Sequence, residues 1–341
     1  MYDTRSILQD LGRNMAENRS VYASENKVLI REQRNSKEQI FFLAIEPLEE
    51  KRMLIIPIFK QMGNLYIKQF PLCKGTRVER VPFDKLGFLH NQDSIIIKQT
   101  SSDYETFEAF LVSLLYELWD CSAAEVFVAV QQTLQRWHDF FSKVGEDGLS
   151  SEQRRGLYGE LYFLRGLIRG GVNKGIVTYW RGPYRDSVDF RIESIGIEVK
   201  TTTTYKPTKV KISSEDQLTA DDLKNMFLYV LSLKVSTGYG ESLEQIIGEI
   251  EYKLKDWPGY LKSFREALFA AGYHELQAER YRTEKYIVLH TEYFNVKNNF
   301  PRLIISDLPS CIANVQYDLI LDGLREHIVQ ESQIIEMIQG L

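Results

Sequence analysis

The strongest constraint on the fold is a pair of short stretches, Ser187–Ile192 and Ile195–Lys200, in which apolar and polar residues alternate. A period of two residues predicts two β-strands, and a glycine-containing turn near Ser194–Gly196 could fold them into a hairpin. The hairpin would place Asp189 of the first strand beside Glu198 and Lys200 of the second. Two adjacent carboxylates repel each other unless a hard divalent cation lies between them. The pattern therefore predicts a metal site of the kind that cleaves phosphodiester bonds.

An acid two residues before a lysine is a common spacing and does not by itself identify a site. What distinguishes Glu198 is the preceding strand, whose apolar residues Val188, Phe190 and Ile192 are expected to face one side while Asp189 faces the other. An exposed hairpin with an ordinary cross-strand ion pair is the alternative interpretation. The same spacing also begins at Glu25, Glu49, Asp222 and Glu251.

Length and composition are typical of a protein with two domains. The chain has 341 residues, of which 44% are hydrophobic, enough for two sizeable cores. The sequence has no apolar run of about 18 residues and no signal peptide, so we expect a cytoplasmic protein. Its three cysteines are widely spaced, which favours a reducing compartment and argues against structural zinc. Phosphate-loop and serine-hydrolase motifs are also missing from the sequence.

Basic residues are concentrated in one segment, although the whole chain carries a formal net charge of −5. Residues 151–211 contain twelve lysines and arginines against six acidic residues, while the rest of the chain is strongly acidic. A basic zone around clustered carboxylates suits a site that binds a polyanion. A solvated surface with unrelated arginines is the alternative explanation.

The order of strand-like and helix-like stretches predicts three parts. Residues 1–102 begin with a helix over residues 4–18 and continue as a β-rich domain for recognition or interaction. Residues 103–149 form a helical connector, and residues 150–341 form the domain that carries Asp189. The expected strands of the first part are Val28–Ile30, Gln39–Ile45, Met53–Phe59, Leu65–Ile67 and Ser94–Ile97, and the connector helices are Tyr104–Leu118 and Ala123–Lys143.

A helix opens the third part and carries a further acidic residue. Ser150 or Ser151 is expected to cap this helix. Glu160 lies beside its apolar stripe, where an ionised carboxylate needs a cation. We therefore expect Glu160 to be either a third metal ligand or the partner of a neighbouring arginine. Later elements are expected as strands over Phe227–Val235, Lys285–His290 and Tyr317–Leu321, and as helices over Ser242–Lys255, Tyr260–Ala271 and the tail from Glu326.

Six short motifs in this part of the chain have a characteristic order and spacing: residues 156–164, Trp180–Pro183, Asp189–Phe190, Glu198–Thr202, Ile212–Leu218 and Phe300–Leu303. Together they resemble the PD-(D/E)XK nuclease superfamily, and more narrowly a bacterial PD-(D/E)XK family found beside restriction and phage-defence genes. Ser187 and Val188 stand in place of the proline that names the superfamily. The resemblance implies an α/β (α+β) restriction-endonuclease-like core with a mixed central sheet flanked by helices.

The resemblance also implies roles for the matching acidic residues. Asp189 and Glu198, together with the backbone carbonyl of Val199, would bind Mg²⁺, for which Mn²⁺ could substitute. Glu160 would contribute to the same metal site or to a second ion. These oxygen ligands are the kind that hard divalent cations prefer.

Two further residues match the motifs. Lys200 would orient or deprotonate the attacking water and offset negative charge on the phosphate. Gln217, expected near the start of a helix capped by Ser213 or Ser214, would contact the site or the substrate backbone. An ordinary glutamine in the first turn of that helix is the alternative.

We therefore expect a Mg²⁺-dependent endonuclease that cleaves double-stranded DNA as the cleavage subunit of a restriction or anti-phage system. Its expected partners are a DNA methyltransferase and ATPase or helicase subunits, and one active site per chain favours a homodimer. Two alternatives stay open. One is a non-catalytic DNA-binding or scaffolding subunit that retains the nuclease fold, and the other is a repair or junction-resolving nuclease.

Overall fold

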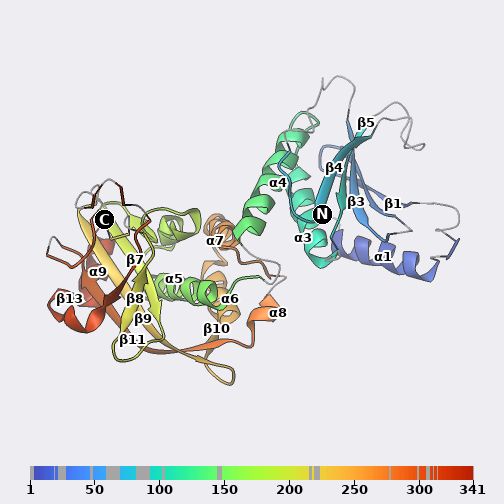
Figure 1. Ribbon diagram of the computed structural model, residues 1–341. Helices are drawn as coiled ribbons and strands as arrows, with labels where there is room; N and C mark the ends of the chain where they lie inside the picture. Colours follow the sequence, from blue (N-terminus) through green and yellow to red (C-terminus); the bar gives the residue numbers. More distant parts are fainter. Residues whose placement is uncertain are drawn as a thin grey trace. The chain divides into compact units, whose positions relative to one another are not determined.

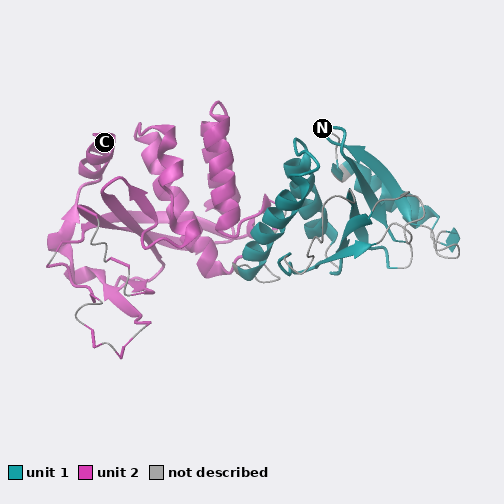
Figure 2. Cartoon of the chain, turned by 90° about the horizontal axis from the view of Figure 1, so that it is seen from above, with its two compact units in different colours: residues 1–142 teal, residues 143–341 magenta. Residues whose placement is uncertain are grey.

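The three-dimensional structure of the chain is a computed structural model. The chain forms two compact units, Met1–Ser142 and Lys143–Leu341 (Figure 2). The residues described are 4–18, 20–21, 28–46, 49–58, 70–81, 93–101, 104–143, 148–214, 217–218, 223–275, 278–297, 299–304, 308–309, 311–312 and 314–340.

The first unit contains an antiparallel sheet with strand order β1-β2-β3-β5-β4, and helices α1 and α3 contact its strands (Figure 1). The expected N-terminal helix, two connector helices and most of the expected strands are confirmed. The predicted strand at Leu65–Ile67 lies outside the described residues. The element bounds are α1 Thr4–Glu17, β1 Leu29–Arg34, β2 Ile40–Ile45, β3 Arg52–Ile58, β4 Thr76–Val81, β5 Asp93–Gln99, α3 Tyr104–Leu118 and α4 Val126–Lys143.

Strand β4 was not expected from the sequence because it lacks a regular apolar face. It lies at the end of the sheet beside β5, and charged side chains at Arg77, Glu79 and Arg80 occupy half of its six positions. Charged residues of this kind discourage pairing with another chain at a sheet edge. The helices α3 and α4, expected as a separate connector, belong to the first unit.

The second unit is built on a mixed sheet with strand order β10-β11-β9-β7-β6, and β13 pairs with β11. Strands β7 and β9 are parallel, while β6 and β7 form the predicted antiparallel hairpin with Phe190 opposite Ile197. The expected α/β architecture is therefore confirmed. The strands are β6 Phe190–Ile192, β7 Ile195–Thr202, β9 Asn225–Ser236, β10 Glu241–Ser242, β11 Lys285–Asn295 and β13 Ile328–Val329.

The two faces of this sheet are covered by different layers. Helix α5 (Ser151–Arg169) packs on one face, where the ring of Phe163 lies 4.9 Å from Phe190 and 5.0 Å from Tyr229. On the other face, buried residues of β9 pack with a two-stranded sheet formed by β8 (Lys209–Ile212) and β12 (Tyr317–Ile320). Because both faces are covered, β7 is buried over most of its length.

Gly159 allows α5 to approach β7 closely. A Cβ atom at Gly159 would lie 2.3 Å from Cγ2 of Thr201 and 3.5 Å from Cγ1 of Val199. A contact of 2.3 Å is far shorter than van der Waals separation, so any larger residue would push the helix away from the strand. The glycine therefore sets the distance between the helix and the strand that carry the predicted site residues.

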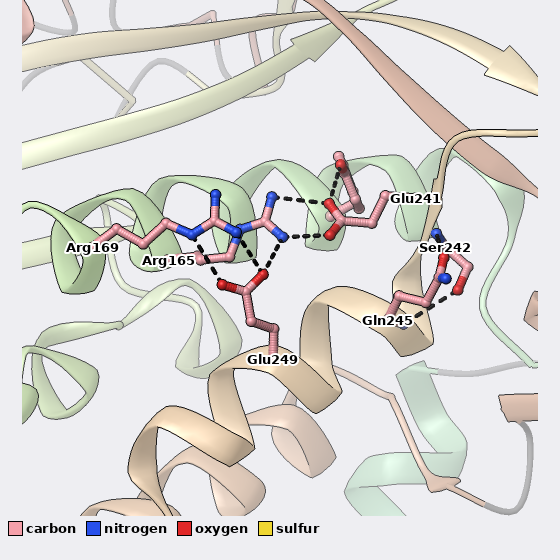
Figure 3. A network of polar contacts seen from close by, with 7 residues as sticks. Arg165, Arg169, Glu241, Ser242, Gln245 and Glu249 are labelled. Atoms are coloured by element: carbon pink, nitrogen blue, oxygen red, sulfur yellow. Dashed lines mark hydrogen bonds and ion pairs between the residues drawn. The ribbon is translucent and has the colours of Figure 1, made fainter.

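A network of charged groups anchors α5 to the following elements (Figure 3). The guanidinium group of Arg165, only 4% exposed, lies 2.9 Å from Glu241 and 2.9 Å from Glu249. Arg169 also binds Glu249, at 2.8 Å, and the Tyr158 hydroxyl donates to Glu241 at 2.7 Å. Burial of an arginine is tolerated here because two carboxylates satisfy its donors. The network ties α5 to β10 and to helix α6 (Leu243–Leu254) and so holds α5 in place.

The remaining helices agree with the sequence except at the tail. Ser150 caps α5, and Ser242 and Gln245 form the predicted capping box of α6. The tail becomes α-helical only at Glu331, because a 3₁₀ turn and β13 occupy the preceding residues. None of the helices in the described part of the chain has the length and apolar character needed to cross a bilayer. The helices are α6 Leu243–Leu254, α7 Pro258–Ala270, α8 Ala278–Tyr281 and α9 Glu331–Gln339, with 3₁₀ helices η3 Lys174–Tyr179 and η4 Gly182–Tyr184.

Candidate active site

Asp189 lies in a bend directly before β6 and not within the strand expected over Ser187–Ile192. The expectation that Val188 and Phe190 share one face is wrong. Val188 packs in the cluster that includes Val210 of β8, whereas Phe190 packs against Phe163 of α5. The chain changes direction between these two anchors, and this bend aims the Asp189 side chain at β7.

The side chain of Asp189 takes the place of a missing strand partner. Pairing between β6 and β7 ends at Phe190 and Ile197, and beyond this pair no strand of the described residues pairs with this edge of β7. One carboxylate oxygen of Asp189 accepts a hydrogen bond from the backbone N–H of Val199 at 2.8 Å. The N–H and C=O groups of one strand residue point to the same side. The carbonyl of Val199 therefore faces the same edge as Asp189.

Val199 and Thr201 of β7 face helix α5. Glu198 and Lys200 therefore extend from the other face of β7, where they form a close ion pair. The Lys200 Nζ lies 2.7 Å from Oε1 of Glu198, and the Glu198 side chain is only 2% exposed. Lys200 also donates to Oε1 of Gln217 at 3.1 Å, and the same oxygen accepts from the backbone N–H of Ser213 at 2.9 Å. The pair is therefore buried, unlike the surface ion pair of the alternative interpretation.

Gln217 reaches Lys200 from a turn and not from the expected helix. Gln217 and Leu218 adopt a turn, and Leu218 has a φ of 65°. Residues 215–216 and 219–222, where the predicted helix would start and continue, lie outside the described residues. Arg302 holds this turn by donating a hydrogen bond to the backbone carbonyl of Leu218.

Glu160 enters the site from α5, on the face opposite Glu198. Its Oε2 accepts a hydrogen bond from the indole N–H of Trp180 at 2.6 Å. An ideal Cβ on Gly182 would lie 2.6 Å from this oxygen and 2.7 Å from Oδ1 of Asp189. Because both oxygens surround the same point, the Glu160 and Asp189 carboxylates are close neighbours. Among the described residues Glu160 forms no ion pair, so the alternative of an arginine partner is not observed.

Burial and mutual repulsion disfavour the charged forms of these acids. Burial, followed by repulsion from Asp189, raises the pKa of Glu160 well above its ordinary value, although the Trp180 hydrogen bond opposes this. The same two causes raise the pKa of Glu198 to about 8, against the opposing effect of Lys200. Burial also raises the pKa of Asp189, although Lys200 and the N–H of Val199 oppose it. Fully ionised, these three acids would carry more negative charge than one lysine balances.

Lys200 is a cation with acidic neighbours, and they change its pKa. Burial alone would lower its pKa, but Glu198 and Asp189 outweigh that effect and raise it. The ammonium form is thus strongly favoured. Lys200 is therefore suited to donating hydrogen bonds to a water molecule or a phosphate oxygen and not to removing a proton.

The donor set fits a hard divalent cation. In the described part of the chain no group of three or more acidic, histidine or cysteine side chains converges into a ready metal site. Mg²⁺ commonly uses only one or two carboxylates and completes its shell with water and substrate phosphates. Glu160, Asp189 and the carbonyl of Val199 offer oxygen ligands at one edge, and a bound cation would offset their repulsion.

The structure thus brings together Glu160, Asp189, Glu198, Lys200 and Gln217, all of which were singled out in the sequence. Their catalytic and metal-binding roles stay predictions. The structure also places near the site residues for which the sequence indicated no role. Trp180 and Gly182 belong to a motif noted only for its spacing, and no local signal indicated that they touch the acids. Arg302 and Tyr317 also lie near the site, since the charges of Arg302 and Lys200 both act on the Tyr317 hydroxyl.

Comparison with known proteins supports the resemblance to the PD-(D/E)XK superfamily. The sequence profile of a family described as "Putative PD-(D/E)XK family member, (DUF4420)" matches residues 13–322. No curated protein and no solved structure matches the chain. The matched segment covers most of the chain and includes all of the site residues described above. The protein therefore belongs to this PD-(D/E)XK family.

Proposed function

We propose that the protein is a Mg²⁺-dependent endonuclease that hydrolyses phosphodiester bonds in double-stranded DNA. The observation that carries the proposal is the meeting of two partly buried carboxylates, Glu160 and Asp189, beside the Glu198–Lys200 pair at the edge of β7. Removing these acidic groups from water costs folding free energy, and a function in binding a cation would explain why the protein keeps them. Family membership supports nuclease chemistry over other uses of such a site.

In this proposal Asp189, Glu160 and the Val199 carbonyl would hold the cation, and Glu198 would be a further ligand. When bound, the metal supplies Lewis-acid stabilisation of charge on the phosphate and lowers the pKa of water. Lys200 would donate a hydrogen bond to the attacking water or to a phosphate oxygen. Its contacts with Glu198 and Gln217 orient the ammonium group before substrate arrives.

The charge of the segment that carries most of the site residues supports a polyanionic substrate. Within residues 151–211 basic side chains outnumber acidic ones two to one. Lys206 and Lys211 follow β7 in sequence and are exposed. Their positive charge would attract the phosphate backbone of DNA at long range. We further propose a cytoplasmic role in restriction or anti-phage defence, with a DNA methyltransferase and ATPase or helicase subunits as partners.

The test is DNA cleavage by the purified protein, alone and with the products of its neighbouring genes, in Mg²⁺ and with Ca²⁺ as a binding-only control. We expect Asp189→Asn and Lys200→Met to lower the cleavage rate at least about 100-fold, because each removes charge that acts on the reacting groups. The matched controls Asp318→Asn and Lys234→Met change exposed residues of the same unit and should cut normally. Normal cleavage by Asp189→Asn would refute the proposal. DNA binding with no cleavage under any condition would instead indicate a non-catalytic scaffold.

A further inference from the structure

The segment Trp180–Gly182 contacts both carboxylates that would face the cation. Trp180 is 1% exposed, and its indole N–H donates to Oε2 of Glu160 at 2.6 Å. The indole ring packs against Phe264 of α7, with 6.0 Å between ring centroids. A tryptophan fixed on one side by packing presents its single donor in one direction. Glu160 is therefore held in one orientation by a neighbour that carries no charge.

The backbone of the same segment holds Asp189. The N–H groups of Arg181 and Gly182 both donate to the backbone carbonyl of Asp189, at 2.7 and 3.0 Å. Trp180 also forms an isolated antiparallel bridge with Phe190, the residue after Asp189. These contacts fix the bend from which the Asp189 side chain reaches Val199. One short segment thus orients an acid from α5 and an acid from the bend before β6.

Gly182 also provides the space between these acids. A methyl group at this position would lie 2.6 Å from Oε2 of Glu160 and 2.7 Å from Oδ1 of Asp189. Both distances are shorter than a carbon–oxygen contact allows, so a side chain would displace at least one carboxylate. The φ angle of Gly182 does not lie in the left-handed region. Closeness to the two acids therefore explains the glycine better than backbone conformation does.

We propose that Trp180 and Gly182 are positioning residues that set the separation of the Glu160 and Asp189 carboxylates for a divalent cation. The inference rests on the proposed function and adds residues to it. Hydrogen-bonding partners of metal-binding carboxylates commonly change metal affinity by about 10- to 100-fold when they are replaced. Trp180 donates a hydrogen bond to Glu160, and Gly182 leaves room for both carboxylates, so their effect would act through Glu160 and Asp189.

The test is calorimetric titration of the full-length protein with Mn²⁺, which suits the same oxygen ligands as Mg²⁺. Trp180→Phe keeps the ring and removes the N–H, and we expect its Mn²⁺ affinity to fall about 10-fold. Trp257→Phe, at a half-exposed position in the same unit, is the matched control and should bind Mn²⁺ normally. Thermal unfolding without metal shows whether each variant is folded.

A double-mutant cycle separates positioning from general damage to the fold. If Trp180 acts through Glu160, Trp180→Phe should have little further effect on Mn²⁺ affinity in a Glu160→Gln background. Gly182→Ala should weaken Mn²⁺ binding at least as much as Trp180→Phe, whereas Gly166→Ala, where a methyl group meets open space, should not. Should Gly182→Ala fail to fold, the Trp180 cycle alone decides the question.

The outcomes distinguish this inference from the proposed function. Unchanged Mn²⁺ affinity in Trp180→Phe, with clear binding by the wild type, would overturn the positioning role and leave the nuclease proposal standing. A loss of affinity that is equally large in the Glu160→Gln background would also overturn it. No Mn²⁺ binding by the wild type would overturn both. A loss confined to the background with an intact Glu160 supports the inference.

Discussion

The side chain of Glu198 has two neighbours of opposite charge. Lys200 lies 2.7 Å away and favours the carboxylate, whereas Asp189 and burial favour the neutral acid. The balance raises the pKa of Glu198 to about 8. The metal-free protein therefore keeps a proton on Glu198 up to a higher pH than an ordinary glutamate does. A divalent cation would compete with that proton, since its positive charge favours the ionised form.

This raised pKa predicts how the stability of the metal-free protein depends on pH. The folded state binds more protons than the unfolded state between the ordinary pKa of glutamate, 4.5, and about 8. The free energy of unfolding should therefore fall as pH rises through this window. Urea denaturation in the presence of a chelator, at intervals from about pH 5 to pH 8.5, measures the slope.

Glu198→Gln removes one titrating group and should make this slope shallower, while Glu160 and Asp189 keep part of it. Glu292→Gln, on β11 of the same unit, is the control and should leave the slope unchanged. An identical slope in the wild type and Glu198→Gln would show that Glu198 has an ordinary pKa in the folded protein.

The elements around the site differ in how far sequence could predict them. Helix α5 and strand β7 were predicted because capping by Ser150 and apolar alternation are local signals. The bend at Asp189 was missed because it depends on Val188 and Phe190 packing into different layers. Alternation in the sequence cannot show which layer receives each residue.

Contacts between distant segments could also not be predicted from the sequence. The hydrogen bond from Trp180 to Glu160 joins a 3₁₀ region to a helix twenty residues earlier. The pairing of β8 with β12 joins segments more than one hundred residues apart. Motif spacing placed Trp180 among the resembling residues, but only the fold shows what its indole group touches. The polar strand β4 was missed because no apolar face marks it.

Packing between α5 and β7 gives a prediction at the scale of elements. Gly159→Ala would place a methyl group 2.3 Å from Thr201 and should destabilise the protein by about 1–3 kcal/mol. Gly166→Ala, in the same helix but facing open space, should instead stabilise it by about 0.5–1 kcal/mol. Urea or thermal unfolding of the two variants measures both effects. Equal effects of the two substitutions would show that α5 does not approach β7 so closely.

The whole molecule combines an acidic overall charge with a basic segment that carries most of the site residues. A net charge of −5 disfavours binding of DNA over the entire surface, whereas the excess of basic residues in 151–211 favours binding by the second unit. The first unit offers an antiparallel sheet with helices and contains none of the residues of the candidate site. We expect it to bind a partner or to recognise DNA, and the second unit to hold the phosphate backbone.

Salt dependence of DNA binding tests this division of charge. Lys206→Ala with Lys211→Ala should weaken DNA binding measured in Ca²⁺. The slope of the logarithm of the binding constant against the logarithm of salt concentration should become shallower by about 1 for each lost phosphate contact. Lys253→Ala with Lys262→Ala, on α6 and α7, is the control of equal charge and should leave the slope unchanged. Equal effects of the two pairs would mean that DNA binding follows net charge and not this segment.

The most direct test of the account is an anomalous difference map from crystals of the protein soaked in Mn²⁺. The account predicts a peak at coordination distance from the carboxylate oxygens of Asp189 and Glu160, on the side of the Val199 carbonyl, and no such peak in Asp189→Asn crystals. A map with no peak at these oxygens in the wild-type protein, at Mn²⁺ concentrations that saturate known carboxylate sites, would contradict it.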